Sequence, residues 1–158
     1  MEKIKNVSIK YGIITAIAYI VYFLLIRLIG MHENPWFRLF NGIIMFAGLY
    51  AAVKEYKSKD SIRMTYYSGF RAALFTGFLS TIIFILFMAI YMYHLDTEFV
   101  KNVMDSWFED YNQGPAIVLF LIFVEGLASS MILTLTIMQK EKKSQNLKQD
   151  KKIYQQKV

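Results

Sequence analysis

One apolar segment, residues 115–138, limits most strongly what this chain can fold into. It holds twenty-four residues and a single charged side chain, Glu125, near its middle. A helix rises ~1.5 Å per residue, so the segment is ~36 Å long as a helix and can cross a hydrocarbon core of ~30 Å with some tilt. The segment therefore predicts a membrane-spanning helix that carries a carboxylate inside the bilayer.

Three earlier apolar blocks predict three further spans: residues 12–29, 37–53 and 69–93. The second block is the shortest and lies at the lower limit of length for a span. The chain has 158 residues, a length typical of one domain, and 56% of them are hydrophobic. We therefore expect an all-α membrane protein, with an antiparallel bundle of four transmembrane helices over residues 1–140.

The charges of the polar segments predict the orientation of these spans. The N-terminal segment, the connection from Lys54 to Ser68 and the C-terminal tail carry excess lysine and arginine, whereas residues 94–114 have a local charge of −4. Basic segments stay on the cytoplasmic side of a membrane. Both termini are therefore expected on the cytoplasmic side of the membrane, with residues 141–158 as a basic, disordered cytoplasmic tail.

The acidic segment between the third and fourth spans has a pattern of its own. Its apolar residues between 97 and 111 fall on one helical stripe, and Gly114-Pro115 breaks the pattern before the last span. This spacing predicts a short amphipathic helix that lies on the membrane or over the mouth of the bundle, on its outer side.

Small residues predict where the spans touch. Helices associate in a membrane through close backbone contact at small side chains, because burying leucine there gains little over lipid. The third span offers Gly69, Ala73 and Gly77 at a spacing of four, and the fourth offers Gly126 and Ser130. We expect these five positions to lie at helix–helix contacts.

Glu125 is the main candidate for a functional residue. A charged carboxylate at mid-bilayer costs roughly 2.5–3.5 kcal/mol, so Glu125 must be protonated, paired or in contact with water. Counting from the outer ends of the spans places Tyr19, Asn41 and Thr81 near its depth, whereas Arg71 lies at the opposite edge. Glu125 is then either a proton- or cation-binding site or a neutral acid hydrogen-bonded between helices, and we favour the second.

The sequence favours no catalytic function. It contains no cysteine, no nucleophile pattern and no glycine-rich phosphate loop, so we expect no enzyme activity and no cofactor. His32, Glu33, His94, Asp96 and Glu98 lack the spacing of zinc ligands, so no metal site is expected. The expected partners are membrane lipids, with anionic lipid at the basic inner face, and a second copy or another membrane protein, but no nucleic acid.

Three stretches of the chain carry a family resemblance: YYSGFRAALFTGF (66–78), IYMYHLDTEF (90–99), and Gly126 with Ser129 and Ser130 before the final lysines. With these the chain resembles DUF4199, a family of small four-span bacterial inner-membrane proteins classed as a domain of unknown function. The resemblance implies the fold but no activity, and Glu125 matches no family motif. We interpret the protein as a non-catalytic structural or interaction component; the alternative is a small transporter or a proton- or ion-responsive protein that uses Glu125.

Overall fold

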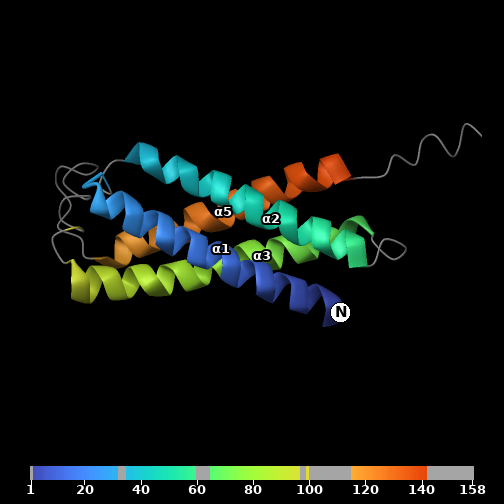
Figure 1. Ribbon diagram of the computed structural model, residues 1–158, viewed down its shortest axis with the longest axis horizontal. Coiled ribbons are helices and arrows are strands. Elements are labelled where there is room, and N and C mark those ends of the chain that lie inside the picture. Colours follow the sequence, from blue (N-terminus) through green and yellow to red (C-terminus); the bar gives the residue numbers. More distant parts are fainter. Residues whose placement is uncertain (1, 32–34, 60–64, 97–98, 100–114, 142–158) are drawn as a thin grey trace, which may run out of the picture.

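The computed structural model describes residues 2–31, 35–59, 65–96, 99 and 115–141. These ranges contain helices and no strand (Figure 1). The four long helices are each apolar and long enough to cross a membrane: α1 (Glu2–Leu28), α2 (Leu39–Lys59), α3 (Tyr66–Ile90) and α5 (Pro115–Glu141). A 3₁₀ turn, η1 (Pro35–Arg38), leads into α2, and a π-helical turn, η2 (Tyr91–Leu95), follows α3.

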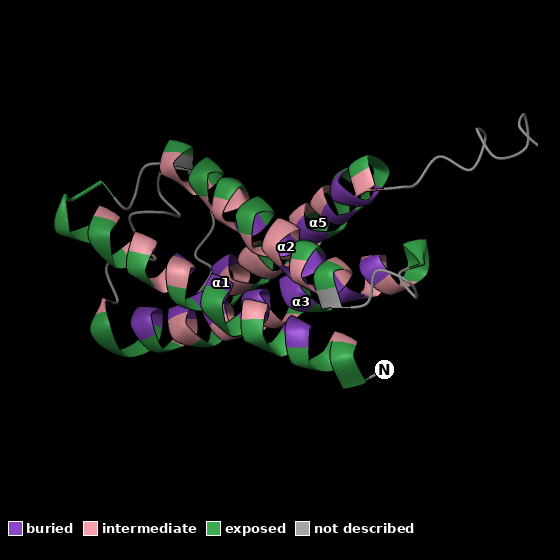
Figure 2. Cartoon of the chain, turned by 45° about the vertical axis from the view of Figure 1, so that its right-hand side comes forward, coloured by how far each residue is buried: buried purple, intermediate pink, exposed green. Residues whose placement is uncertain are grey.

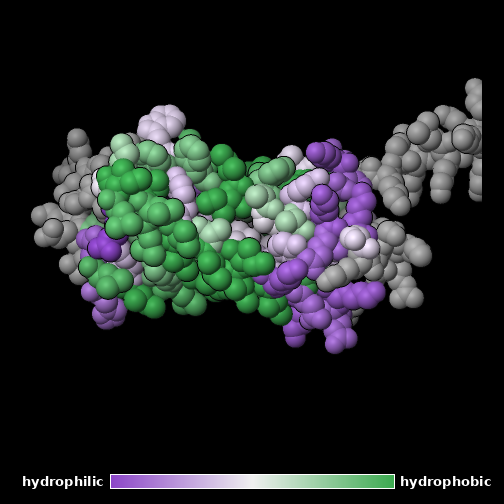
Figure 3. Space-filling view, viewed as in Figure 1, coloured by the Kyte–Doolittle hydropathy of each residue, from purple (hydrophilic) through white to green (hydrophobic). Residues whose placement is uncertain are grey.

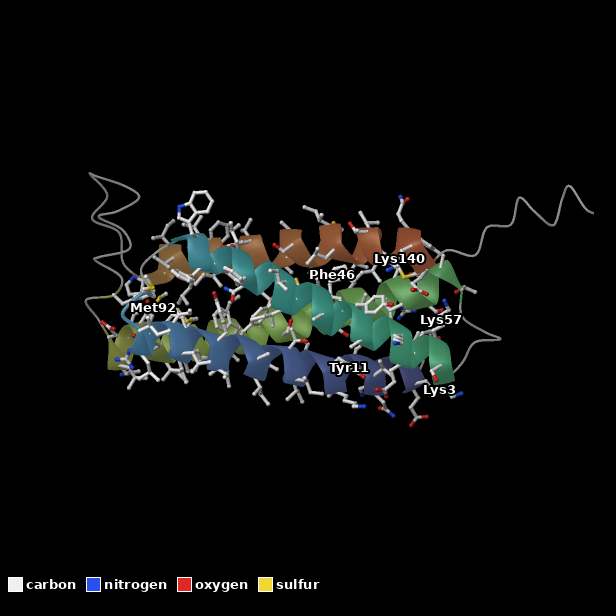
Figure 4. The ribbon with its side chains drawn as sticks, turned by 45° about the horizontal axis from the view of Figure 1, so that its top comes forward. Lys3, Tyr11, Phe46, Lys57, Met92 and Lys140 are labelled. Atoms are coloured by element: carbon white, nitrogen blue, oxygen red, sulfur yellow. The ribbon has the colours of Figure 1, made fainter. Side chains whose placement is uncertain are left out.

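Contacts between helix ends show that successive helices run in opposite directions. Near the start of α1, the Ser8 hydroxyl donates to the Ala72 carbonyl near the start of α3, at 2.9 Å. At the same end of the bundle, Lys57 near the end of α2 pairs with Glu141, the last residue of α5. We call this the basic end, and the opposite end, where Met92 lies in Figure 4, the cavity end. The four helices thus form an antiparallel bundle.

The helices extend beyond the apolar blocks, mainly at the basic end. Helix α1 begins at Glu2, ten residues before the apolar block that starts at residue 12. Within this added segment, the Lys10 amine lies 2.6 Å from the Glu55 carboxylate and attaches the segment to α2. The prediction that residues 54–68 are all connection is wrong, since α2 continues to Lys59 and α3 begins at Tyr66. Thr65 and Ser68 exchange hydrogen bonds as a capping box at the start of α3.

The surface of the bundle is apolar along its middle. Figure 3 shows hydrophobic side chains over most of the visible face and hydrophilic ones gathered at the basic end. Exposed residues lie on the outward faces of the helices (Figure 2), and many of them are large and apolar, such as Ile17, Ile43 and Ile132. Helix α3 is the most buried of the four candidate spans and α5 the least. An apolar surface of this extent fits contact with lipid rather than water.

Two predicted elements lie largely outside the described residues. Of the amphipathic helix expected at 97–111, the structure describes Phe99 alone, whose ring is buried against Phe23 and Tyr91 at centroid distances of 5.9 and 5.7 Å. Of the tail expected at 141–158, it describes Glu141, which belongs to α5.

Candidate functional site

Three of the predicted small residues, Gly77, Gly126 and Ser130, lie where α3 and α5 meet. A Cβ atom added to Gly77 would overlap the Ser130 side chain, and one added to Gly126 would lie 2.5 Å from Thr81 Cγ2. Gly69 and Ala73 are buried in α3 closer to the basic end. The two backbones are therefore in close contact at Gly77 and Gly126, and a larger residue at either position would separate them.

Beyond these contacts, toward the cavity end, the helices enclose a cavity of about 110 Å³. All four long helices contribute to its wall. Its lining consists of Tyr19, Phe23, Arg38, Asn41, Gly42, Met45, Thr81, Phe84, Met88, Met92, Phe99, Val118, Ile122, Glu125, Gly126 and Ser129. The four polar residues singled out from the sequence are all among them, although they come from four different helices.

The polar and apolar parts of this lining are separated along α1, α3 and α5. On these helices the residues nearer the basic end, which we call the polar floor, are Tyr19, Thr81, Glu125 and Ser129. The residues nearer the cavity end, which we call the apolar roof, are Phe23, Met88, Met92, Phe99 and Val118. On α2 the order is reversed, since Asn41 lies nearer the cavity end than Met45.

Glu125 is paired with Arg38 across the side of the cavity. The guanidinium Nη2 atom of Arg38 lies 2.6 Å from Glu125 Oε2 and donates a charge-assisted hydrogen bond to it. Residue counting does not place Arg38 near Glu125, so this charged partner is a finding of the structure. The Arg38 side chain is 29% exposed and that of Glu125 is 51% exposed, so the pair lies at the edge of the cavity rather than in a sealed core.

The position of the pair along the bundle follows from residue counts. Fifteen residues separate Glu125 from Lys140 in α5, which is ~22 Å of helix. If the hydrocarbon core begins near Lys140, Glu125 lies ~8 Å below its opposite boundary, because that core is ~30 Å thick. Arg38 ends η1 directly before α2, near that boundary, and its long side chain reaches inward to the carboxylate.

The remaining polar groups of the region fall into two classes. Some have partners: Tyr22 donates to the Phe37 carbonyl at 2.8 Å, and Ser80 donates to the Gly77 carbonyl at 2.9 Å. Within the described ranges, Asn41 Oδ1 and Thr81 Oγ1 are buried without a hydrogen-bond partner. Leaving such a group unsatisfied costs about 1–3 kcal/mol. The polar floor therefore retains hydrogen-bonding capacity.

Aromatic side chains and one carboxylate close the cavity end. The Tyr91 hydroxyl donates to Asp96 Oδ2 at 2.7 Å, and Asp96 Oδ1 accepts the backbone N–H of Phe99 at 3.0 Å. The guanidinium of Arg27 lies 4.9 Å from the centroid of the Tyr91 ring. These contacts hold Phe99 in place within the apolar roof.

The basic end carries a different set of charges. Lys140 lies 5.6 Å from the Tyr50 ring centroid, and Arg71 lies 5.6 Å from that of Tyr67. Figure 4 shows Lys3, Lys57 and Lys140 at this end, far from Met92. Cations placed next to aromatic rings in this way are typical of a membrane–water boundary.

Among the residues that the structure describes, no three histidine, cysteine, aspartate or glutamate side chains form a group able to hold a metal ion. His32, Glu33 and Glu98 lie outside those residues.

Comparison with known proteins places the chain in a family. No curated protein and no solved structure matches it. A family model described as "Protein of unknown function (DUF4199)" matches residues 10–157, which is nearly the whole sequence. The match covers all four long helices except the first turns of α1. The chain belongs to the DUF4199 family.

Proposed function

We propose that the protein is a non-catalytic structural or interaction component of a bacterial inner membrane, with four spans and both termini in the cytoplasm. The basic residues at one end of the bundle support this orientation, because Lys10, Lys57 and Lys140 lie together there and basic segments stay inside. The apolar surface between the two ends supports membrane insertion.

The observation that carries the structural role is the Arg38–Glu125 pair. It joins the start of α2 to the middle of α5, the least buried candidate span. An ion pair inside a membrane is a directional contact between helices, whereas apolar contacts there compete with lipid. The pair therefore fixes α5 against α2, whereas the small-residue contacts at Gly77 and Gly126 fix α5 against α3.

The alternative function, a small transporter or a proton- or ion-responsive protein, would require Glu125 to exchange its partner. Arg38 already neutralises the carboxylate at 2.6 Å, which favours the structural role. Purified protein in liposomes tests this choice. We expect no pH-dependent ion flux from the wild type. A flux that Glu125→Gln abolishes while the helices stay folded would contradict the proposal.

For partners we propose lipids with anionic headgroups at the basic end, and a second copy or another membrane protein along the apolar faces. Each lysine or arginine near an anionic surface contributes ~1 kcal/mol to such binding. Orientation is tested with reporters fused after Val158. A fluorescent protein that folds only in the cytoplasm should be bright, and alkaline phosphatase, which works only outside it, should be inactive. The reverse result would contradict the orientation.

A further inference from the structure

We propose that the cavity binds a small, neutral aromatic molecule that carries one hydroxyl or N–H donor, with this donor directed toward the polar floor. The inference goes beyond a structural role, although it uses the neutral Arg38–Glu125 pair of that proposal. It rests on the polarity, lining, size and unsatisfied oxygens of the cavity.

Along α1, α3 and α5 the polarity of the cavity is opposite to that of a membrane lipid. Thr81 in the polar floor, on α3, precedes Met92 in the apolar roof, in η2, by eleven residues, or ~16 Å of helix. A lipid keeps its polar head at the membrane surface and its apolar tail toward the middle. The tail of a bound lipid would therefore lie on the polar floor. A compact molecule with its polar group toward the bilayer centre matches the cavity better.

The apolar lining suits an aromatic ring. Phe23, Phe84 and Phe99 supply ring faces and edges, and Met45, Met88 and Met92 supply polarizable side chains that adapt to a flat ligand. A cavity of roughly 150 Å³ lined by apolar side chains holds benzene. The volume of this cavity, about 110 Å³, has room for roughly one aromatic ring.

The unsatisfied oxygens of the lining require a hydrogen-bond donor. Thr81 Oγ1 in the polar floor and Asn41 Oδ1 nearer the cavity end have no partner within the described ranges. Thr81 is 3% exposed, so its hydroxyl does not hydrogen-bond to bulk water. A ligand O–H or N–H can satisfy one of these oxygens after rotation of the threonine hydroxyl or of the asparagine amide.

The charge of the floor argues for a neutral ligand. The charges of Arg38 and Glu125 compensate each other, so the net charge of the pair at the cavity is zero. A cationic ligand would add an unpaired charge within the membrane, which is costly. Phenol-like and indole-like molecules carry a donor without a charge and therefore fit best.

Saturable binding of 4-fluorophenol, measured by ¹⁹F NMR with the full chain in lipid nanodiscs, tests the proposal. Empty nanodiscs report partition into lipid, and 4-fluorotoluene provides the same shape without the donor. We expect saturable binding of 4-fluorophenol, about tenfold tighter than that of 4-fluorotoluene, which is the effect of one hydrogen bond. Absence of saturable binding, or equal affinity for the two molecules, would overturn the proposal.

Two pairs of variants locate the site. Thr81→Val removes a floor hydroxyl, whereas Thr134→Val removes a buried hydroxyl that is also without a partner in the described ranges and does not line the cavity. Gly42→Leu adds a side chain at a lining position where a Cβ meets nothing within 4 Å, whereas Ala47→Leu adds one at an exposed position of α2.

Thr81→Val should weaken 4-fluorophenol binding about tenfold and leave 4-fluorotoluene unchanged, and Thr134→Val should change neither. Gly42→Leu should weaken the binding of both ligands, and Ala47→Leu should weaken the binding of neither. Equal effects within either pair would overturn the assignment of the site. The structural role of the ion pair is tested separately, by unfolding the Arg38 and Glu125 variants without ligand, so the two proposals can fail independently.

Discussion

Between the basic end and the middle of the bundle, glycines hold the helices in direct contact, whereas toward the cavity end aromatic and methionine side chains hold them apart. A Cβ added to Gly12, Gly48 or Gly77 would meet a side chain of a neighbouring helix at once. Around the cavity, a Cβ at Gly42 meets nothing within 4 Å. The first region leaves no space for a ligand, and the second leaves about 110 Å³.

The ion pairs of the two regions differ in their surroundings. The Lys10–Glu55 pair lies at the basic end, where the Lys10 side chain is 53% exposed and water competes for both charges. The Arg38–Glu125 pair lies within the predicted span, where lipid offers neither charge a partner. The difference teaches that close backbone packing joins α5 to α3, whereas an ion pair joins α5 to α2.

The largest effect is expected from Gly77→Leu. Its Cβ would overlap the Ser130 side chain and force α3 away from α5, so the free energy of unfolding should fall by about 3 kcal/mol or more. Denaturation in mixed micelles, followed by circular dichroism, measures this change. Gly42→Leu is the matched control and should leave stability nearly unchanged. Equal losses in both variants would remove the contrast between the two regions.

A smaller effect is expected when one member of the embedded pair is removed. Arg38→Ala leaves the Glu125 carboxylate without its cation, and the free energy of unfolding should fall by roughly 2 kcal/mol after allowance for its partial exposure. The same denaturation in micelles or nanodiscs checks this. The double variant Arg38→Met with Glu125→Leu should recover most of the loss, because an apolar pair leaves no charge unpaired. Additive losses in the double variant would show that the two residues do not act as a pair.

The smallest effect is expected at the basic end. Lys10→Ala should lower the free energy of unfolding by less than about 1 kcal/mol, because an exposed pair is weakened by water and by salt. Unfolding at low and high salt measures this dependence. The Arg38–Glu125 pair should respond less to salt. A Lys10 variant as unstable as the Arg38 variant would contradict the distinction between the two pairs.

The fold could be predicted from the sequence because each span is an unbroken apolar block. The ends were less predictable, since residues such as Lys3 and Lys57 continue helices although they carry no hydrophobic signal. Lysine is a good helix former, and contacts such as that of Lys10 with Glu55 stabilise the part of α1 that precedes its apolar block. Tertiary contacts of this kind leave no periodic pattern in the sequence.

The candidate site was predictable in its residues but not in its pairing. Counting depth found Tyr19, Asn41, Thr81 and Glu125, and all four line one cavity. It missed Arg38, because this residue lies at the very start of a span, whereas its side chain extends inward to Glu125. The available signal was the conflict with the positive-inside pattern, since Arg27 and Arg38 flank an outer loop. Both arginines have partners in the structure, Tyr91 and Glu125.

The central claim is that four helices cross the membrane with the basic end inside, and single-cysteine labelling tests it most directly. The chain contains no cysteine, so each introduced thiol is the only label site. On intact cells, a membrane-impermeant maleimide should label Met31→Cys and Leu95→Cys but not Lys10→Cys or Lys140→Cys, which should react after lysis. Labelling of Lys10→Cys or Lys140→Cys on intact cells, with Met31→Cys and Leu95→Cys protected, would contradict the claim.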